Sequence, residues 1–111
     1  MKMNKELLKG SSPILVLSLL KQGDMYGYQM ILKLKNQSNC VFEMKEGTLY
    51  PILHSLEQGG AVTSYWQEAG GRKRRYYHLS PKGKQLLEEK QKEWNVYVTA
   101  VNQVMGGALC E

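Results

Sequence analysis

The chain is 111 residues long, carries a net charge of +5 and is 42% hydrophobic, which suits one soluble globular domain. It has two cysteines, too few for a disulfide framework, and no apolar run near the ~20 residues of a membrane span. These features exclude a disulfide-stapled secreted domain and an integral membrane protein. They favour a cytoplasmic protein. The short apolar run after the first lysines has no cleavage site behind it, so we interpret it as a core helix.

The excess positive charge lies before residue 81. Residues 1–80 hold 11 of the 15 Lys and Arg and 6 of the 10 Asp and Glu, and residues 81–111 hold four of each sign. A basic surface suits an anionic partner such as nucleic acid. We therefore expect the anion-binding site in the first 80 residues.

Two helices are predicted in the first third of the chain. Residues 14–20 are apolar on all sides, with Ser12 and Pro13 as cap and first residue, and residues 5–10 form a helical turn before a kink at the proline. A second helix is expected over residues 26–35, where the apolar side chains gather on one side and the lysines on the other.

A third helix is predicted from Glu46 to Gln58. Its leucines and isoleucines recur at i, i+3, i+4 and i+7, which is one face of a helix. Two glycines follow and end it. Pro51 lies inside this segment and predicts a local distortion.

A β-hairpin and a long helix complete the chain. The β-rich runs 61–67 and 74–79 flank a Gly-Gly turn, and alternation places Val62, Ser64 and Trp66 on one face. Ser80-Pro81 then opens a helix that reaches about Val104. Its apolar residues form an a/d seam, interrupted at Gln91, typical of helix dimerisation. The seam consists of Leu87, Trp94, Val98, Val101 and Met105.

This order of elements predicts a mainly α fold with a small β-hairpin: a winged helix-turn-helix plus a C-terminal dimerisation helix. Residues 1–80 are expected to bind DNA and residues 81–111 to form the dimerisation helix, within one compact unit. A helix fits the major groove, and a basic wing reaches the flanking backbone or minor groove. Two recognition helices about 34 Å apart would match a pseudo-palindrome in double-stranded DNA.

Three segments resemble PadR-like transcriptional regulators. They are Tyr26-Gly27-Tyr28, residues 46–57 (EGTLYPILHSLE) and residues 70–83 (GGRKRRYYHLSPKG), and the resemblance covers nearly the whole chain. The single long C-terminal helix is similar to the compact, multidrug-responsive branch of that family, where it is the dimerisation element. The resemblance implies a homodimeric repressor of nearby genes that a small effector releases.

Candidate DNA contacts lie at the start of the third helix and in the wing. Free N–H groups at a helix start favour phosphate, a glycine there allows close approach, and a run of four basic residues suits phosphate or the minor groove. The alternatives are that Tyr50 packs on the second helix, that Tyr26 has a packing role, that Thr48 only begins the third helix, and that the wing is a solvated turn. The candidates are Tyr26, Lys45, Gly47, Thr48, Tyr50, Arg72, Lys73 and Arg74.

Trp94 is the candidate effector residue. The resemblance implies that a tryptophan here holds planar or hydrophobic ligands between protomers, while the alternative is a packing role in the dimer seam. Residues that would line the same space are Val98, Leu7, Ile14 and Leu17. No acid follows Trp94 at i+3 or i+4, so a preference for cationic ligands is not supported.

Enzyme, metal and cofactor roles find no support in the sequence. The two histidines, His54 and His78, and the two cysteines, Cys40 and Cys110, are scattered, and neither histidine has an acid and nucleophile set nearby. For Cys40 burial is expected rather than a redox role. Two rival functions remain open: a constitutive winged-helix DNA binder without an effector, and a winged-helix protein-interaction module.

Overall fold

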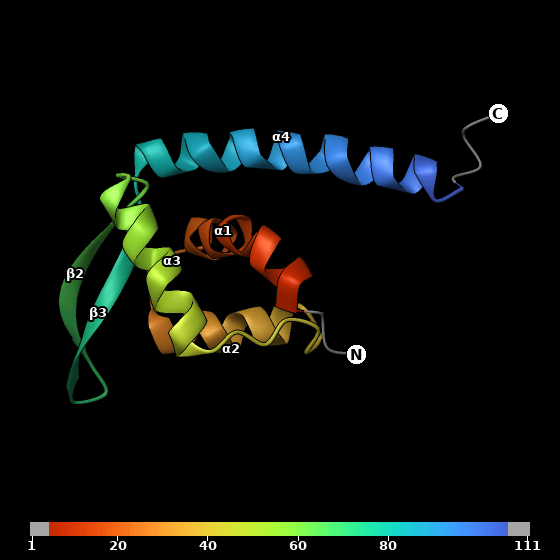
Figure 1. Ribbon diagram of the computed structural model, residues 1–111. Helices are drawn as coiled ribbons and strands as arrows, with labels where there is room; N and C mark the ends of the chain where they lie inside the picture. The colour runs from red at the N-terminus through yellow and green to blue at the C-terminus, as the bar shows by residue number, and fades with distance from the viewer. Residues whose placement is uncertain (1–4, 107–111) are drawn as a thin grey trace.

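The computed structural model describes residues 5–106, with side chains from Leu8 onward, and Figure 1 shows the arrangement. Four helices and a three-stranded antiparallel sheet follow one another as a winged helix with a long final helix, which confirms the predicted fold class. The elements are α1 (Lys5–Lys21), β1 (Met25–Tyr26), α2 (Gly27–Gln37), α3 (Glu46–Gln58), β2 (Val62–Ala69), β3 (Arg72–Leu79) and α4 (Pro81–Val104).

The first helix is longer than predicted. It runs through Pro13 without interruption, so the expected start at Ser12 and Pro13 is wrong. The buried Ser12 hydroxyl does not cap the helix; it donates to the Leu8 carbonyl oxygen at 2.6 Å. A proline inside a helix removes one backbone hydrogen bond, and burial of Leu8 and Ser12 in the turn before it keeps that turn helical.

The sheet contains a strand that the sequence did not predict. β1 has only two residues, and it pairs with β3 through Met25 opposite Tyr77 and Tyr26 opposite Tyr76. Tyr26 is therefore the N-cap of α2 and not its first residue. Two residues are too few for an alternating pattern to be visible, which explains why the strand was missed.

The predicted hairpin is confirmed, with longer strands. Ala69 pairs with Arg72, so Gly70 and Gly71 alone form the turn. Both have positive φ, +60° and +79°, the geometry of a type I′ turn, which non-glycine residues adopt only with strain. The turn is therefore tight, and the basic residues that follow lie directly at the tip of the wing.

The core lies where the helices meet the base of the sheet. The most deeply buried large side chains are Leu17, Met30, Leu49, Leu53 and Leu87, contributed by all four helices. The first half of α4 packs across α1, and its second half extends beyond the other elements, giving a molecule 59 × 31 × 20 Å in extent (Figure 1). Within residues 5–106 no helix has the length and hydrophobicity needed to cross a bilayer.

Ser80 fixes the start of α4 against the end of α3. Its hydroxyl donates toward the carbonyl oxygens of Gly60 and Ala61, at 2.6 and 2.9 Å, and accepts from the Gly83 N–H at 3.0 Å. This confirms Ser80 as the N-cap, with Pro81 in the first turn. A Cβ on Gly83 would lie 2.7 Å from Leu79 Cδ1 and 3.0 Å from the Ala61 carbonyl carbon, so only glycine fits this crossing.

We predict that Gly83→Ala lowers the free energy of unfolding by about 1–3 kcal/mol, because the added methyl group meets backbone that cannot move cheaply. Gly10→Ala is the matched control, since nothing lies within 4 Å of a Cβ there and alanine favours helix by about 0.5–1 kcal/mol. Urea denaturation of both variants measures the difference. Equal stability of Gly83→Ala and the native protein would contradict this packing.

Candidate nucleic-acid interface

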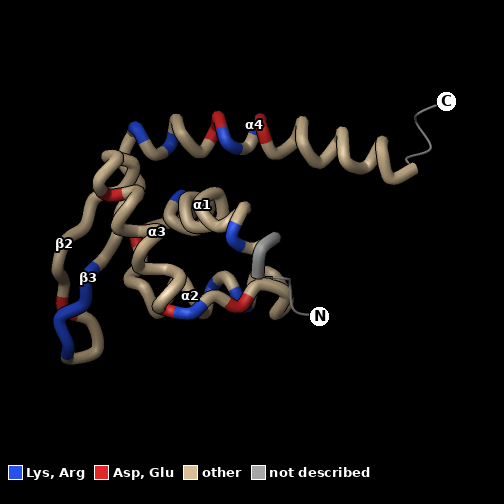
Figure 2. Tube along the Cα trace, viewed as in Figure 1, with Lys and Arg blue, Asp and Glu red and all other residues tan. Residues whose placement is uncertain are grey.

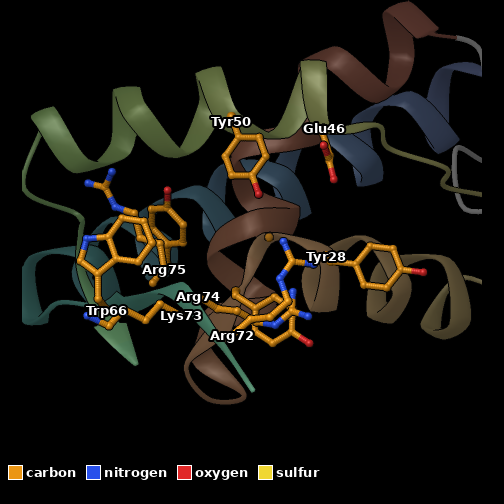
Figure 3. Close-up of a pocket in the computed structure, with 11 residues that line it drawn as sticks. Tyr28, Glu46, Tyr50, Trp66, Arg72, Lys73, Arg74 and Arg75 are labelled. Atoms are coloured by element: carbon orange, nitrogen blue, oxygen red, sulfur yellow. The ribbon is translucent and has the colours of Figure 1, made fainter. Parts of the chain in front are cut away.

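A groove of about 640 Å³ separates the starts of α2 and α3 from the wing. Figure 3 shows α3 presenting Tyr50 and Glu46 from one side, with the basic side chains of the wing opposite. Lys and Arg gather at the turn end of the hairpin (Figure 2). The residues that line the groove are Tyr26, Gly27, Tyr28, Glu46, Tyr50, Trp66, Arg72, Lys73, Arg74, Arg75 and Tyr77.

The predicted DNA contacts fall into two groups. Five of them line the groove, namely Tyr26, Tyr50, Arg72, Lys73 and Arg74. The other three, Lys45, Gly47 and Thr48, are exposed at the start of α3 and are not among its lining residues. The structure therefore presents one basic groove and, beside it, one exposed helix start.

The start of α3 has the geometry of an anion-binding helix end. Lys45 is its N-cap in an extended conformation, and its carbonyl oxygen accepts from the N–H groups of Thr48 and Leu49 at 3.0 and 2.9 Å. Its own side chain makes no capping bond, so the first N–H groups of the helix remain available to an outside acceptor.

Gly27 accounts for the position of Tyr50. A Cβ at Gly27 would lie 2.8 Å from the Tyr50 Cζ atom, so the ring rests on the bare backbone at the start of α2. The Tyr50 side chain nevertheless stays exposed and lines the groove. The two alternatives for Tyr50 are therefore compatible: the ring packs on α2 and still presents its edge to the groove.

The four basic residues of the wing have different surroundings. The Arg75 guanidinium donates to the Glu57 carboxylate at 3.2 Å and to the Ser64 hydroxyl at 3.0 Å. Arg74 lies over the Tyr26 ring at 4.5 Å and donates to the Ala69 carbonyl oxygen at 3.4 Å. Arg72 and Lys73 are exposed at the tip, and within the described part of the chain neither takes part in an ion pair. Two charges thus hold the wing in place and two remain open to a ligand.

An aromatic cluster braces the other face of the wing. The rings of Tyr65 and Tyr76 stack at 5.6 Å, and Tyr26 meets Tyr76 edge-on at 5.4 Å. Asp24, just before β1, accepts from the Tyr65 hydroxyl at 2.7 Å and lies 2.8 Å from His78 Nδ1. These contacts tie the wing to the residues that lead into α2.

The charge of Asp24 is stabilised by its two partners. Burial raises the pKa of this carboxyl, but the hydrogen bonds from Tyr65 and His78 outweigh it and hold the pKa below its ordinary value. The hydrogen bond to Asp24 in turn raises the pKa of Tyr65. Asp24 is therefore an anion at neutral pH, and it holds the wing from the side away from the groove.

Six of the eleven groove residues were absent from the predicted DNA contacts, namely Gly27, Tyr28, Glu46, Trp66, Arg75 and Tyr77. Trp66 is 66% exposed, and the side chains of Tyr28 and Glu46 are exposed as well. The predicted alternation did place Trp66 on the same face as Ser64, whose hydroxyl donates to Glu57 of α3. The alternation therefore predicted that Trp66 faces α3. It could not predict that the side chain stays exposed, because periodicity does not show whether a neighbour covers a residue.

A second hollow, of about 610 Å³, lies between α1 and α4. Of the residues predicted to hold an effector, Trp94 and Ile14 line it, Leu17 is buried in the core, and Val98 is half-buried outside the lining set. The side chain of Leu7 lies outside the described residues. The lining residues are Ser11, Ile14, Leu15, Ser18, Phe42, Gln91, Trp94 and Asn95.

The predicted dimer seam changes character along α4. Leu87 is 1% exposed, within the core of the single chain. Further along, Trp94 is 45% and Met105 73% exposed, with Val98 and Val101 half-buried between them. The stripe that packs on α1 at the start of α4 therefore continues past the rest of the fold.

The scattered cysteine and histidines form no cluster. In the part of the chain that the structure describes, no three His, Cys, Asp or Glu side chains are placed to hold a metal ion. The expectation that Cys40 is buried is wrong: it is exposed, and with Asn39 it adopts a positive φ in the turn after α2. Cys110 lies outside the described residues.

A helix-turn-helix with a basic wing beside its second helix defines the winged-helix class of DNA-binding folds. The model of the transcriptional regulator PadR-like family matches residues 16–89, and the chain belongs to that family of transcriptional regulators. This confirms the resemblance that the sequence motifs indicated. Such regulators are not a class of enzymes.

Two solved structures of transcriptional regulators agree with this assignment. A transcriptional regulator from Clostridium thermocellum is similar, with a TM-score of 0.83, 30% identity, and coverage of 89% of this chain and 97% of the other. A PadR family transcriptional regulator from Eggerthella lenta has a TM-score of 0.81 and 31% identity over 91% and 87% of the two chains. Uncharacterized protein X from Lysinibacillus sphaericus is 31% identical, over 92% of this chain and 94% of its own.

Proposed function

We propose that this chain is a cytoplasmic homodimeric repressor that binds a pseudo-palindromic operator in double-stranded DNA. In this proposal residues 1–80 bind the DNA, residues 81–111 form the dimerisation helix, and a small planar or hydrophobic effector between the protomers releases the operator. The observation that carries it is the groove between α3 and the wing, with Arg72 and Lys73 open at its rim.

The two parts of the interface suit two parts of the duplex. The start of α3 offers N–H donors together with the exposed Lys45, Gly47 and Thr48, which fits phosphate and the edges of bases in the major groove. The wing tip, with Arg72 and Lys73, extends from the same side and fits the adjacent backbone. Tyr26, Tyr50 and Arg74 lie between the two and complete the contact surface.

We predict that Arg72→Ala or Lys73→Ala weakens binding to every duplex. The slope of log K against log salt should become shallower by about 0.9 for each phosphate that is no longer neutralised, hence by about 1.8 for a dimer with two wings. Fluorescence anisotropy of a labelled duplex from 50 to 300 mM salt, with the chain's own upstream DNA as first probe, measures both the affinity and the slope.

Lys84→Ala is the matched control for that experiment, because Lys84 is exposed on α4 and lies outside the groove lining. It removes the same unit of charge and should leave the salt slope unchanged. Equal slopes for the native protein and both wing variants would count against the wing. No binding to any duplex by the native protein would favour the rival protein-interaction module.

The second half of α4 supports the homodimer. Trp94, Val98, Val101 and Met105 follow one stripe, and no other element of the described chain extends far enough to cover all of it (Figure 1). A second copy of the same helix would bury the stripe and would bring two recognition helices into one rigid frame. Leu87 takes no part in this interface because its own core buries it.

We predict that Val101→Asp converts the dimer to a monomer, because it places a charge in the proposed seam. Val96→Asp is the matched control: five residues earlier, Val96 is 71% exposed and falls on the opposite side of the helix. Sedimentation velocity distinguishes the two. Monomers for both variants, or dimers for both, would contradict the seam.

The hollow between α1 and α4 supports an effector site. Trp94 contributes an exposed aromatic face to it, with Ile14 and Leu15 as an apolar wall. In the proposed dimer a second Trp94 would approach from the partner, and Val98 and Leu7 would lie nearby on the same two helices. Two aromatic faces close together suit a flat, apolar ligand.

We predict that a planar aromatic dye with no affinity for duplex DNA quenches Trp94 fluorescence. The chain has two tryptophans, so Trp66→Phe leaves Trp94 as the single reporter. Trp94→Ala should weaken dye binding by about 10-fold while the protein stays dimeric, as expected when one aromatic face is removed from the site. Unchanged dye binding and unchanged dye-induced release of DNA by Trp94→Ala would overturn the ligand role of Trp94. A native protein that binds no planar dye and keeps its DNA in the presence of each would favour the constitutive DNA binder.

A further inference from the structure

The DNA-facing groove contains one acidic side chain. Of its eleven lining residues four are Arg or Lys, and Glu46 alone is acidic. In the described part of the chain Glu46 takes part in none of the ion pairs and side-chain hydrogen bonds, whereas Glu57 on the same helix is paired with Arg75. An unpaired carboxylate is unexpected in a surface that has to approach phosphates, because like charges repel.

The geometry of α3 directs Glu46 toward the ligand. Glu46 is the first residue of the helix, and Tyr50 lies one turn later on the same flank. Glu57 belongs to this flank too, and its bonds to Arg75 and Ser64 show that the flank faces the wing. In Figure 3 the carboxylate of Glu46 points into the space between α3 and the wing, beside the Tyr50 ring.

Few groups on DNA can donate a hydrogen bond to a carboxylate in the major groove. Phosphate oxygens offer no proton, and neither do guanine N7 and O6 or thymine O4. Cytosine presents its N4 amino group alone as a donor, while adenine presents a donor together with an acceptor that a carboxylate repels. A negative charge at a helix start also favours the helix itself, but that role does not depend on the base sequence.

We propose that Glu46 is a specificity-determining residue, which accepts a hydrogen bond from the N4 amino group of one cytosine in each half-site. The inference rests on the proposed operator binding. On a matching site the carboxylate gains a donor. On other DNA the carboxylate faces hydrogen-bond acceptors and phosphates and finds no donor. The same side chain therefore lowers the affinity for non-specific DNA.

The test is selection from a randomised duplex library with the native protein and two variants. Glu46→Ala removes the carboxylate from the groove. Glu68→Ala is the matched control, because Glu68 is exposed on β2 near the wing tip and its loss removes the same charge without touching α3. Thermal unfolding confirms that each variant is folded.

The native protein should enrich a cytosine at one position of each half-site, and replacing that cytosine should weaken binding by about 10-fold. With Glu46→Ala the same replacement should cost less than about 3-fold, and binding to scrambled duplex should tighten. Glu68→Ala should also bind scrambled duplex more tightly and keep the cytosine preference. Glu46→Gln, which keeps the length of the side chain, should shift the preference toward adenine, because an amide both donates and accepts.

The failure of this inference is separable from failure of the proposed function. A cytosine that remains enriched to the native level with Glu46→Ala and Glu46→Gln would overturn the role of Glu46 and leave operator binding intact. A native protein that binds duplex and enriches no sequence would overturn both.

Discussion

The contact between Glu57 on α3 and Arg75 on β3 sets the relation between the recognition helix and the wing. The Ser64 hydroxyl of β2 joins it, so α3 and both strands of the wing meet at one point. Both charged side chains are partly exposed, and a pair of this kind contributes about 0–1 kcal/mol to stability. Its importance is therefore geometric: it fixes the direction of the wing, and the proposed contact of Arg72 and Lys73 with the same DNA as α3 depends on that direction.

The wing contains four consecutive basic residues, but not all four charges are available to a ligand. Arg75 is neutralised by Glu57, and Arg74 lies on the Tyr26 ring. Cation–π and ion-pair contacts of this type hold the side chain in one place, and a ligand would have to replace them in order to use the full charge. The electrostatic surface of the wing is thus concentrated at its tip, where the type I′ turn leaves Arg72 and Lys73 exposed.

The elements that follow from local sequence rules could be predicted. The elements that depend on contacts between distant residues could not. The apolar face of α3, the Gly-Gly turn and the Ser80 cap follow from local rules, so their positions agreed with the structure. The two-residue β1 and the continuation of α1 through Pro13 depend on tertiary burial, which no window of sequence contains. The packing of Tyr50 on Gly27 could not be predicted for the same reason, because it depends on how α2 and α3 cross.

α1 connects the proposed effector hollow to the groove. It contacts α4 on one side and α2, α3 and β3 on the other, so both proposed sites rest on one helix. Leu17, one turn before its end, is fully buried, and Ile14, about one turn earlier, lines the hollow. Because a packed core transmits displacement with little compression, a ligand that moves α4 relative to α1 has to move the recognition helices of a dimer as rigid bodies. In the proposed dimer, release of DNA by such a ligand would change the distance between the two α3 helices and would leave each groove intact.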